Sequence, residues 1–456
     1  MEEPWSSILR CPYCRGRFRF DETQRPAECD AEFGILRCDC GAFPVVDGIP
    51  IVLRPRVSMF AHTTGAPRVH GVAVAHVVRL IEGGRPLEAL VECLAIPMLP
   101  PLARRWLPAR VVDSHAGYRV ARWRGKRKLR RQVLARRRAI SAQALLDFYY
   151  QLGQPLGRAI GDYFILRFAQ PRHLAALALL AAMPGGEKPV LDIACGLGHF
   201  EHYLSERTDP AAAIGIDMNY FQLWIARHWI ATKSRFVCAK TQDGLPFSSD
   251  AFSATLCSDA YHLLPGRPGL RQEIERCAPG RPVLLTGVGN RAVMPNEGLE
   301  LTVQEYLDEF GAVDVRSFSE TDLVRAYLRR SNPFVLPARS PLELNETKWL
   351  SFAWNVPPTL REPLWEKDAW PHAVGEISVN LIYRSTRTKE GDLQLRFTFP
   401  SVWFAYENHG MLSYHPQQAT ISRAQLQRLA AWREDPSLAA LVESFVLIGL
   451  PARFKA

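Results

Sequence analysis

The chain has 456 residues, 47% of them hydrophobic, 10% aromatic and 22% charged, which excludes a mainly disordered protein and suggests about three domains. The formal net charge is +10, but eleven Lys and Arg residues and no acid lie between positions 119 and 138, so the rest of the chain is close to neutral. The longest purely apolar stretch has ten residues (174–183) and no apolar signal segment follows the acidic start, so we expect a cytoplasmic protein with reduced thiols and no membrane-spanning helix.

Cysteines are concentrated at the start of the chain, where two close pairs, Cys11-x-x-Cys14 and Cys38-x-Cys40, are separated by 23 residues. Two turns that each present two thiolates to one ion are typical of a tetrahedral structural zinc site. We therefore predict that Cys11, Cys14, Cys38 and Cys40 bind zinc, with Cys29 able to replace either of the last two. The metal would stabilise a small ribbon-like domain over residues 1–55. Reduced, unligated cysteines are the alternative.

A longer motif surrounds these cysteines. From Leu9 to Leu53 it runs L-x-C-P-x-C … C-x-C-G-x-F-P-V-V-D-G-I-P-I-V-L. This motif resembles the small zinc-ribbon proteins that activate tRNA and release-factor methyltransferases. The resemblance implies a zinc ribbon of the methyltransferase-activator type.

Residues 60–180 are predicted to form a mostly helical linker or cap that contains the basic segment, itself helical over 126–140. A run of like charges is either a solvated face or a surface for an anionic partner, RNA or lipid headgroups. Trp123 lies among the cations, which suits stacking on a base or anchoring at a headgroup layer. The sequence therefore leaves open an RNA partner or a peripheral membrane contact at residues 119–138.

Residues 186–289 alternate between short apolar strands and helical segments, with strands expected at 189–193, 212–217, 235–239, 252–258 and 282–286. A turn of small residues follows the first strand and opens a helix, which allows the backbone to approach a nucleotide-like ligand. Asp217 ends the second strand 19 residues after Gly198, about where a carboxylate binds ribose hydroxyls in such folds. The alternation predicts an α/β, Rossmann-like parallel sheet with ligands at the carboxyl ends of its strands.

The glycine turn distinguishes between two kinds of nucleotide ligand. A dinucleotide fingerprint would require glycine where this chain has Glu201. The order D-x-[small]-x-G-x-G at 192–198, with G-L-P-F at 244–247 and P-G-x-x-x-L-L at 279–285, instead resembles class I S-adenosylmethionine (SAM) methyltransferases. This resemblance implies a sheet that is parallel except for a terminal antiparallel pair.

The resemblance also implies which residues hold the cofactor. The methionine pocket would be shaped by Asp192, Ala194, Gly196 and Gly198, the ribose bound by Asp217, the adenine faced by the segment of Asp243 and Leu245, and the reaction centre lined from Asp259 onward. Ala194 replaces the first glycine of the motif, so we expect a negative φ there. Lys240 stands where the family often has an acid for the adenine amino group, a place that Asp243 or backbone contacts would fill.

The reaction centre is expected just after the fourth strand. Methyl transfer to oxygen or nitrogen requires that the acceptor lose its proton. His262 is the candidate base, because its free pKa lies near about 6.5. Asp259 would orient His262 or line the pocket, and Tyr261 would pack against the substrate. A histidine without a catalytic role is the alternative.

The last third of the chain is expected to supply a substrate cap over residues 290–370, with helices at 301–310 and 320–330. Apolar residues then alternate with polar ones over 377–383 and 393–399, which predicts a β-hairpin. We assign this hairpin to the terminal antiparallel pair of the sheet, within a region 371–456 that also holds aromatic and helical segments.

Three functions compete at this level. We favour a SAM-dependent methyltransferase that acts on an oxygen or nitrogen atom of a small or medium organic substrate. An RNA methyltransferase that uses the zinc ribbon and the basic segment is the first alternative. A non-enzymatic scaffold with the SAM fold is the second.

Overall fold

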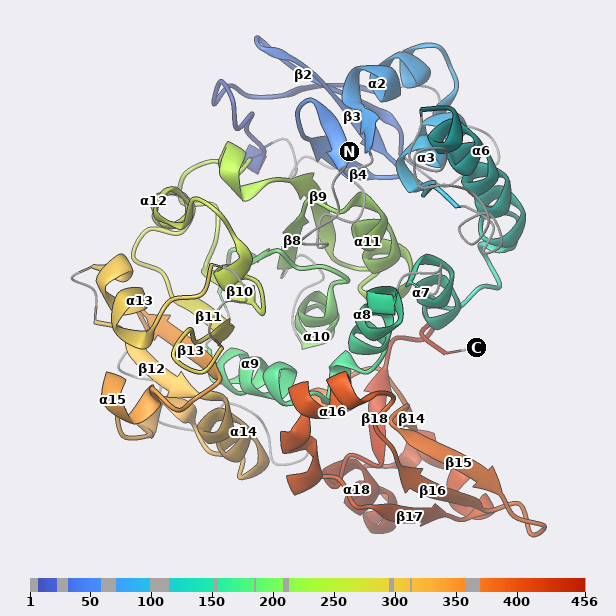
Figure 1. Ribbon diagram of the computed structural model, residues 1–456, viewed down its shortest axis with the longest axis vertical. Coiled ribbons are helices and arrows are strands. Elements are labelled where there is room, and N and C mark those ends of the chain that lie inside the picture. Colours follow the sequence, from blue (N-terminus) through green and yellow to red (C-terminus); the bar gives the residue numbers. More distant parts are fainter. Residues whose placement is uncertain are drawn as a thin grey trace.

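One sheet of eleven strands organises the computed structural model, which describes residues 7–22, 32–58, 71–98, 115–150, 155–183, 186–207, 213–294, 299–311, 314–356 and 370–455. Its strand order is β1-β2-β3-β4-β9-β8-β7-β10-β11-β13-β12, and it crosses the molecule from the N-terminal segment through the green strands of Figure 1. No helix within the described residues is both long and apolar enough to cross a membrane. Cys29 lies outside the described residues.

The centre of the sheet is parallel. It consists of β7 (Val190–Ile193), β8 (Ala213–Asp217), β9 (Arg235–Ala239), β10 (Ala254–Ser258) and β11 (Val283–Gly289). The connecting helices are α10 (His199–Arg207), α11 (Tyr220–Ile225) and α12 (Arg267–Cys277). These strands are almost entirely buried, because helices cover both faces of such a sheet. The predicted Rossmann-like α/β fold is therefore confirmed.

The terminal antiparallel pair exists, but the prediction of its position was wrong. β13 (Trp349–Trp354) runs antiparallel to β11, and β12 (Arg316–Ser319) runs antiparallel to β13. Both strands fall inside the segment expected to form the cap. β13 is buried along its whole length, so it lacks the polar alternation by which strands were sought.

The predicted hairpin over 377–399 forms outside the main sheet. β15 (Tyr383–Arg387) pairs with β16 (Leu393–Phe397), and β17 (Gln418–Ile421) completes a three-stranded sheet. β14 (Glu376–Val379) pairs separately with β18 (Leu447–Leu450). These strands lie in the red C-terminal part of Figure 1. Their alternation reflects one solvated face, as the exposed side chains of β15 show.

The cysteine-bearing segment joins the main sheet rather than standing apart from it. Its strands are β1 (Arg19–Glu22), β2 (Gly34–Cys38), β3 (Gly41–Val46) and β4 (Ile49–Val52). β4 pairs in parallel with β9, with Ile51 opposite Cys238 and Val52 opposite Ala239. The strands β1 to β4 therefore extend the sheet that carries the glycine turn.

Helices and short strands complete the structure. Between the first four strands and β7 come β5 (Arg56–Ser58), β6 (Gly71–Ala73), α2 (Val74–Glu82), α3 (Pro86–Leu94), α6 (His115–Gln132), α7 (Ala142–Tyr150), α8 (Pro155–Ile165) and α9 (Pro171–Ala181). After β11 come α13 (Val303–Phe310), α14 (Glu320–Leu328), α15 (Pro341–Leu344), α16 (Val402–Glu407), α17 (Arg423–Leu426) and α18 (Pro436–Glu443). Two hydrophobic cores result. One contains α9, α10 and α11, and the other contains α12 and α13.

Candidate functional site

The four predicted zinc ligands come together. The sulfur atoms of Cys11, Cys14, Cys38 and Cys40 all lie within 4.8 Å of one another. Cys40 Sγ lies 3.4 Å from Cys11 Sγ and 3.5 Å from Cys38 Sγ. Zinc–sulfur bonds of about 2.3 Å at tetrahedral angles place sulfurs about 3.8 Å apart. Four thiols at this spacing fit a structural zinc ion.

The turn between the first two cysteines contacts the segment expected to face adenine. The Tyr13 hydroxyl donates to Asp243 Oδ2 at 2.7 Å. Arg15 donates to both oxygens of Glu273 at 2.8 and 2.9 Å, and Glu273 in turn accepts from the backbone N–H of Leu245 at 2.8 Å. Burial alone would raise the pKa of Glu273, but hydrogen bonds from Arg276 and Arg15 lower it to about 2. The turn between Cys11 and Cys14 thus fixes residues 243–245, directly through Tyr13 and indirectly through Arg15 and Glu273.

The turn after β7 has the backbone shape of an anion- and ligand-binding loop. φ is +59° at Ala194, +56° at Gly196 and +73° at Gly198. A negative φ was expected at Ala194, and the structure contradicts this. A left-handed alanine costs about 1–2 kcal/mol, and strain of this kind is found where a ligand site requires it. At Gly198 a Cβ would lie 3.1 Å from the Ala226 and Phe236 side chains.

Asp217 lies at the end of β8, beside this turn. Its Oδ2 accepts from the backbone N–H of Gly196 at 3.2 Å. Its Oδ1 accepts from the backbone and side-chain nitrogens of Asn219 at 2.8 and 3.0 Å. A buried carboxylate thus joins the ends of the two strands between which the cofactor of such folds lies. The turn and Asp217 together fit the SAM pattern.

Asp192 and Glu201 form a buried pair of acids behind the turn. Their four oxygens are buried, and the two carboxyls interact with each other. Burial and the charge of Glu201 raise the pKa of Asp192 well above its ordinary range, and burial raises the pKa of Glu201 to about 8. A Cβ at Gly215 would lie 2.4 Å from Glu201 Oε1, so only glycine fits there. The pair therefore retains a proton near neutral pH.

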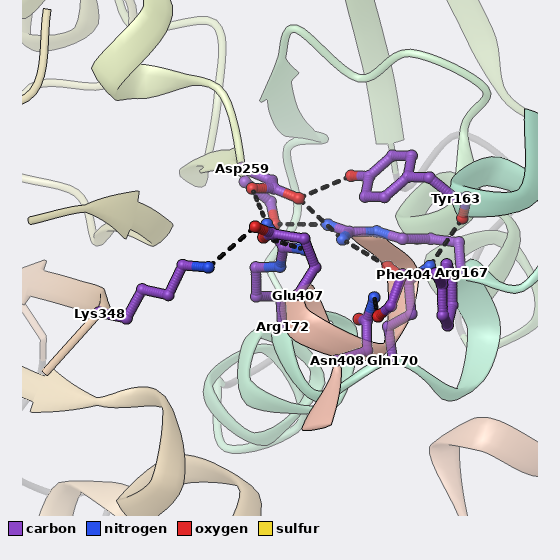
Figure 2. Close-up of polar contacts among 10 residues, drawn as sticks. Tyr163, Arg167, Gln170, Arg172, Asp259, Lys348, Phe404, Glu407 and Asn408 are labelled. Atoms are coloured by element: carbon purple, nitrogen blue, oxygen red, sulfur yellow. Dashed lines mark hydrogen bonds and ion pairs between the residues drawn. The ribbon is translucent and has the colours of Figure 1, made fainter. Parts of the chain in front are cut away.

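At the carboxyl end of β10, Asp259 is bound into a network of cations (Figure 2). Its Oδ2 accepts from the Tyr163 hydroxyl at 2.7 Å and from Arg167 at 3.0 Å, and its Oδ1 accepts from Arg172 at 3.2 Å. Burial would raise the pKa of Asp259, but the charges of Arg172 and Arg167 lower it to about 2. Asp259 therefore stays ionised, and its hydrogen bonds orient Arg167 and Arg172 rather than His262.

The network continues into the C-terminal part of the chain. Arg172 also pairs with Glu407 of α16 at 3.4 Å, and Glu407 pairs with Lys348 at 2.8 Å. Figure 2 shows Glu407 between Arg172 and Lys348, with Lys348 on the side away from Tyr163. No motif in the sequence pointed to these residues, because their partners in the network lie far away along the chain. The only sequence feature that pointed to this network was Asp259, the acidic residue directly after the fourth strand.

His262 lies at the same edge of the sheet. It is 4% exposed, its Nδ1 has no partner in the described part of the chain, and burial lowers its pKa to about 4. The imidazole is therefore neutral at pH 7. Glu320, which the sequence analysis did not select, has a buried Oε2 without a described partner, and burial raises its pKa to about 7. Tyr261, expected to pack against substrate, is instead buried in the core, where its hydroxyl donates to Glu309.

Known proteins resemble both the domain with the glycine turn and the cysteine-bearing segment. The model of a methyltransferase domain family matches residues 190–279. A UPF0434 protein of Bordetella pertussis is 43% identical over 53 residues, which cover 12% of this chain and 74% of the relative. The chain therefore carries an N-terminal domain of the UPF0434 family followed by a methyltransferase domain.

Solved structures similar to this chain share low sequence identity with it. One is a complex of the Haloferax volcanii Trm112 methyltransferase activator with a methyltransferase, at 17% identity, covering 43% of this chain and 95% of that chain with a TM-score of 0.33. Another is a SAM-dependent methyltransferase of Mesorhizobium loti, at 19% identity, covering 40% and 97% with a TM-score of 0.31.

Proposed function

We propose that this methyltransferase transfers the methyl group of SAM to an oxygen or nitrogen atom of a small or medium organic substrate. The observation that carries the proposal is the burial of the polar edge of the sheet. Arg167, Arg172 and Asp259 have side chains 4–8% exposed, and α16 is tied to this edge through Glu407. An edge covered in this way suits an acceptor that is enclosed, rather than one that stays attached to a large macromolecule.

The cofactor would lie against the turn at 194–198. In this proposal Asp192, Ala194, Gly196 and Gly198 shape the methionine end, Asp217 accepts from the ribose hydroxyls, and the segment of Asp243 and Leu245 faces the adenine. Bound SAM supplies an activated methyl group on a positively charged sulfur. The residues of the chain then have to hold the acceptor in line with that methyl group and remove its proton.

Two side chains at the carboxyl edge can accept that proton. His262 is neutral and has an unpartnered nitrogen, and we propose it as the base. Glu320 has a pKa near neutrality, which is favourable for general base catalysis, and it is the second candidate. Asp259 acts as a positioning residue, because it stays ionised and fixes Arg167 and Arg172.

We also propose that Cys11, Cys14, Cys38 and Cys40 hold one structural zinc ion. The sulfur geometry supports this assignment, and the donor set is one that zinc prefers. The metal would fix the turn that carries Tyr13 and Arg15. Through these two residues the zinc site would support the adenine segment of the methyltransferase.

A labelling experiment tests the choice of acceptor. The full chain is incubated with SAM carrying an isotopically labelled methyl group, together with a panel of small alcohols, amines and carboxylates or with total RNA. The proposal predicts that, at neutral pH, the labelled methyl group is found on an oxygen or nitrogen atom of a small molecule. Label in RNA alone would contradict it and favour the RNA methyltransferase.

A further inference from the structure

The outward side of α6 carries a dense set of cations that the methyl-transfer site does not use. We call it the basic face, and its members are all exposed: Arg119, Arg124, Arg127, Lys128, Arg130 and Arg131. Figure 1 shows α6 beside α3 at the edge of the molecule, away from α16 and the carboxyl edge of β10. We propose that the basic face binds RNA through its phosphate backbone.

The inner side of α6 is fixed, so the orientation of the basic face is set by packing. Ala121, Gly125 and Leu129 recur every four residues and are buried. A Cβ at Gly125 would lie 1.9 Å from the Ile96 carbonyl oxygen, so the helix approaches the backbone after α3 closely. The inward cations are neutralised locally, because Arg122 pairs with Glu92 at 2.8 Å and Lys126 contacts the same carboxylate.

The basic face itself has no compensating charge on its own helix. Neither α6 nor the six residues after it contain an acid. Arg124 and Lys128, and likewise Arg127 and Arg131, are four positions apart, and like charges at this spacing destabilise a helix by about 0.2–0.5 kcal/mol per pair. A polyanion would relieve this repulsion. The remainder of the chain is close to neutral in sum, so residues 119–138 account for the net positive charge of the protein.

The side chains of the basic face favour phosphates over a lipid surface. Five of the six cations are arginines, whose planar guanidinium forms paired hydrogen bonds with phosphate. A helix that lies in a membrane interface needs a broad exposed apolar side, but the apolar side of α6 faces α3. The large exposed apolar residues within its described part are Val120 and Trp123.

Trp123 adds a second element of nucleic-acid recognition. The residue is 58% exposed, and the Arg127 guanidinium lies 5.7 Å from the centroid of its ring. Exposed aromatic rings among cations stack on unpaired bases. Folded RNA offers such bases in loops and bulges, whereas duplex DNA keeps its bases stacked. This inference does not depend on which acceptor the enzyme methylates.

Fluorescence anisotropy of the full chain with a labelled stem-loop RNA tests the proposal. The test variant combines Arg124→Gln, Arg127→Gln, Lys128→Gln and Arg131→Gln. We expect at least about a tenfold loss of affinity at low salt and a decrease of about three in the slope of log K against log salt, since each phosphate contact contributes about 0.7–0.9. Trp123→Ala should weaken binding without changing that slope.

A matched control removes the same charge elsewhere. Arg384, Arg387, Lys389 and Arg396 are exposed on the three-stranded sheet, and replacing all four by Gln should leave RNA affinity within about twofold. SAM affinity should be the same in both variants and neither should lose thermal stability, which excludes misfolding. Equal losses in both variants, retained binding in the α6 variant, or binding to phosphatidylserine vesicles without binding to RNA would overturn the proposal.

Discussion

At the scale of single residues, the role of His262 as the general base can be tested directly by mutation. His262→Ala should lower kcat by about 10²–10⁴ while SAM affinity stays within a few-fold, because a general base acts on the acceptor and not on the cofactor. Glu320→Gln is the companion variant, since its carboxyl is the second candidate. The measurement is kcat and KM across pH with an acceptor found by the labelling screen.

The two bases predict different pH profiles. A base at Glu320, with a pKa near 7, gives a rate that rises through neutral pH. A base at His262, with a pKa near 4, gives a rate already level there. A His262→Ala enzyme with a near wild-type rate would remove His262 from the mechanism.

The buried acid pair predicts how stability depends on pH. The pKa of Glu201 is raised to about 8 by burial, so the folded chain holds a proton that the unfolded chain loses above about 4.5. Stability from this proton is complete below the unfolded pKa and is lost as pH rises through about 8. One proton corresponds to about 1.4 kcal/mol per pH unit.

Glu201→Gln should remove this decline, so its urea midpoint should change less between pH 5 and pH 8 than that of the wild type. Glu206→Gln is the control, because Glu206 is exposed at the end of the same helix and pairs with Lys233. Parallel pH profiles for wild type and Glu201→Gln would show that the pair does not share a proton in the folded chain.

At the scale of elements, the contact between the cysteine turn and the adenine segment can be tested without touching a cysteine. Tyr13→Phe removes the hydrogen bond to Asp243, which contributes about 1 kcal/mol or more. SAM binding should therefore weaken by about fivefold, while zinc content stays at one ion per chain. Tyr383→Phe, which removes a hydroxyl bound to the Pro416 carbonyl, should leave SAM affinity unchanged. Equal affinities for wild type and Tyr13→Phe would show that the turn does not support the cofactor.

The elements also show what the sequence could and could not predict. The parallel strands were predictable because each is a short apolar run that ends in, or is followed by, a small or acidic residue, as at Ala194 and Asp217. β13 was missed because it is buried on both faces and shows no alternation. The joining of β4 to β9 was missed because nothing in the apolar run from Ile49 to Leu53 indicates a partner 187 residues away.

The polar edge was predictable only in part. The sequence placed Asp259 and His262 after the fourth strand, where the structure has them. It could not assign Arg167, Arg172 and Glu407 to Asp259, because ion pairs between distant segments leave no local pattern. It also could not give the environment of His262, whose burial lowers a pKa that free histidine would have near about 6.5.

At the scale of the whole molecule, the continuous sheet couples the cysteine cluster to the methyltransferase core. If zinc holds the turn at Cys11 and Cys14, its removal should unfold residues that are hydrogen-bonded to β9 and to Asp243. We expect a strong chelator to lower Tm by about 10 °C or more, on the scale of about 2–4 °C for each kcal/mol lost in a domain of this size. Added zinc should restore both Tm and SAM affinity. Metal analysis that finds no zinc in protein purified under reducing conditions would contradict the assignment.

The central claim is that the chain binds SAM at the turn after β7, and calorimetric titration of the full chain with SAM tests it most directly. The account predicts one site per chain, with affinity about ten- to a hundredfold weaker in Asp217→Ala, because a hydrogen-bonded charge contributes about 1.5–3 kcal/mol. Asp217→Asn, which keeps an acceptor for the Gly196 N–H, separates loss of charge from loss of the fold. No binding by the wild type, or equal affinity in all three proteins with unchanged thermal stability, would contradict the account.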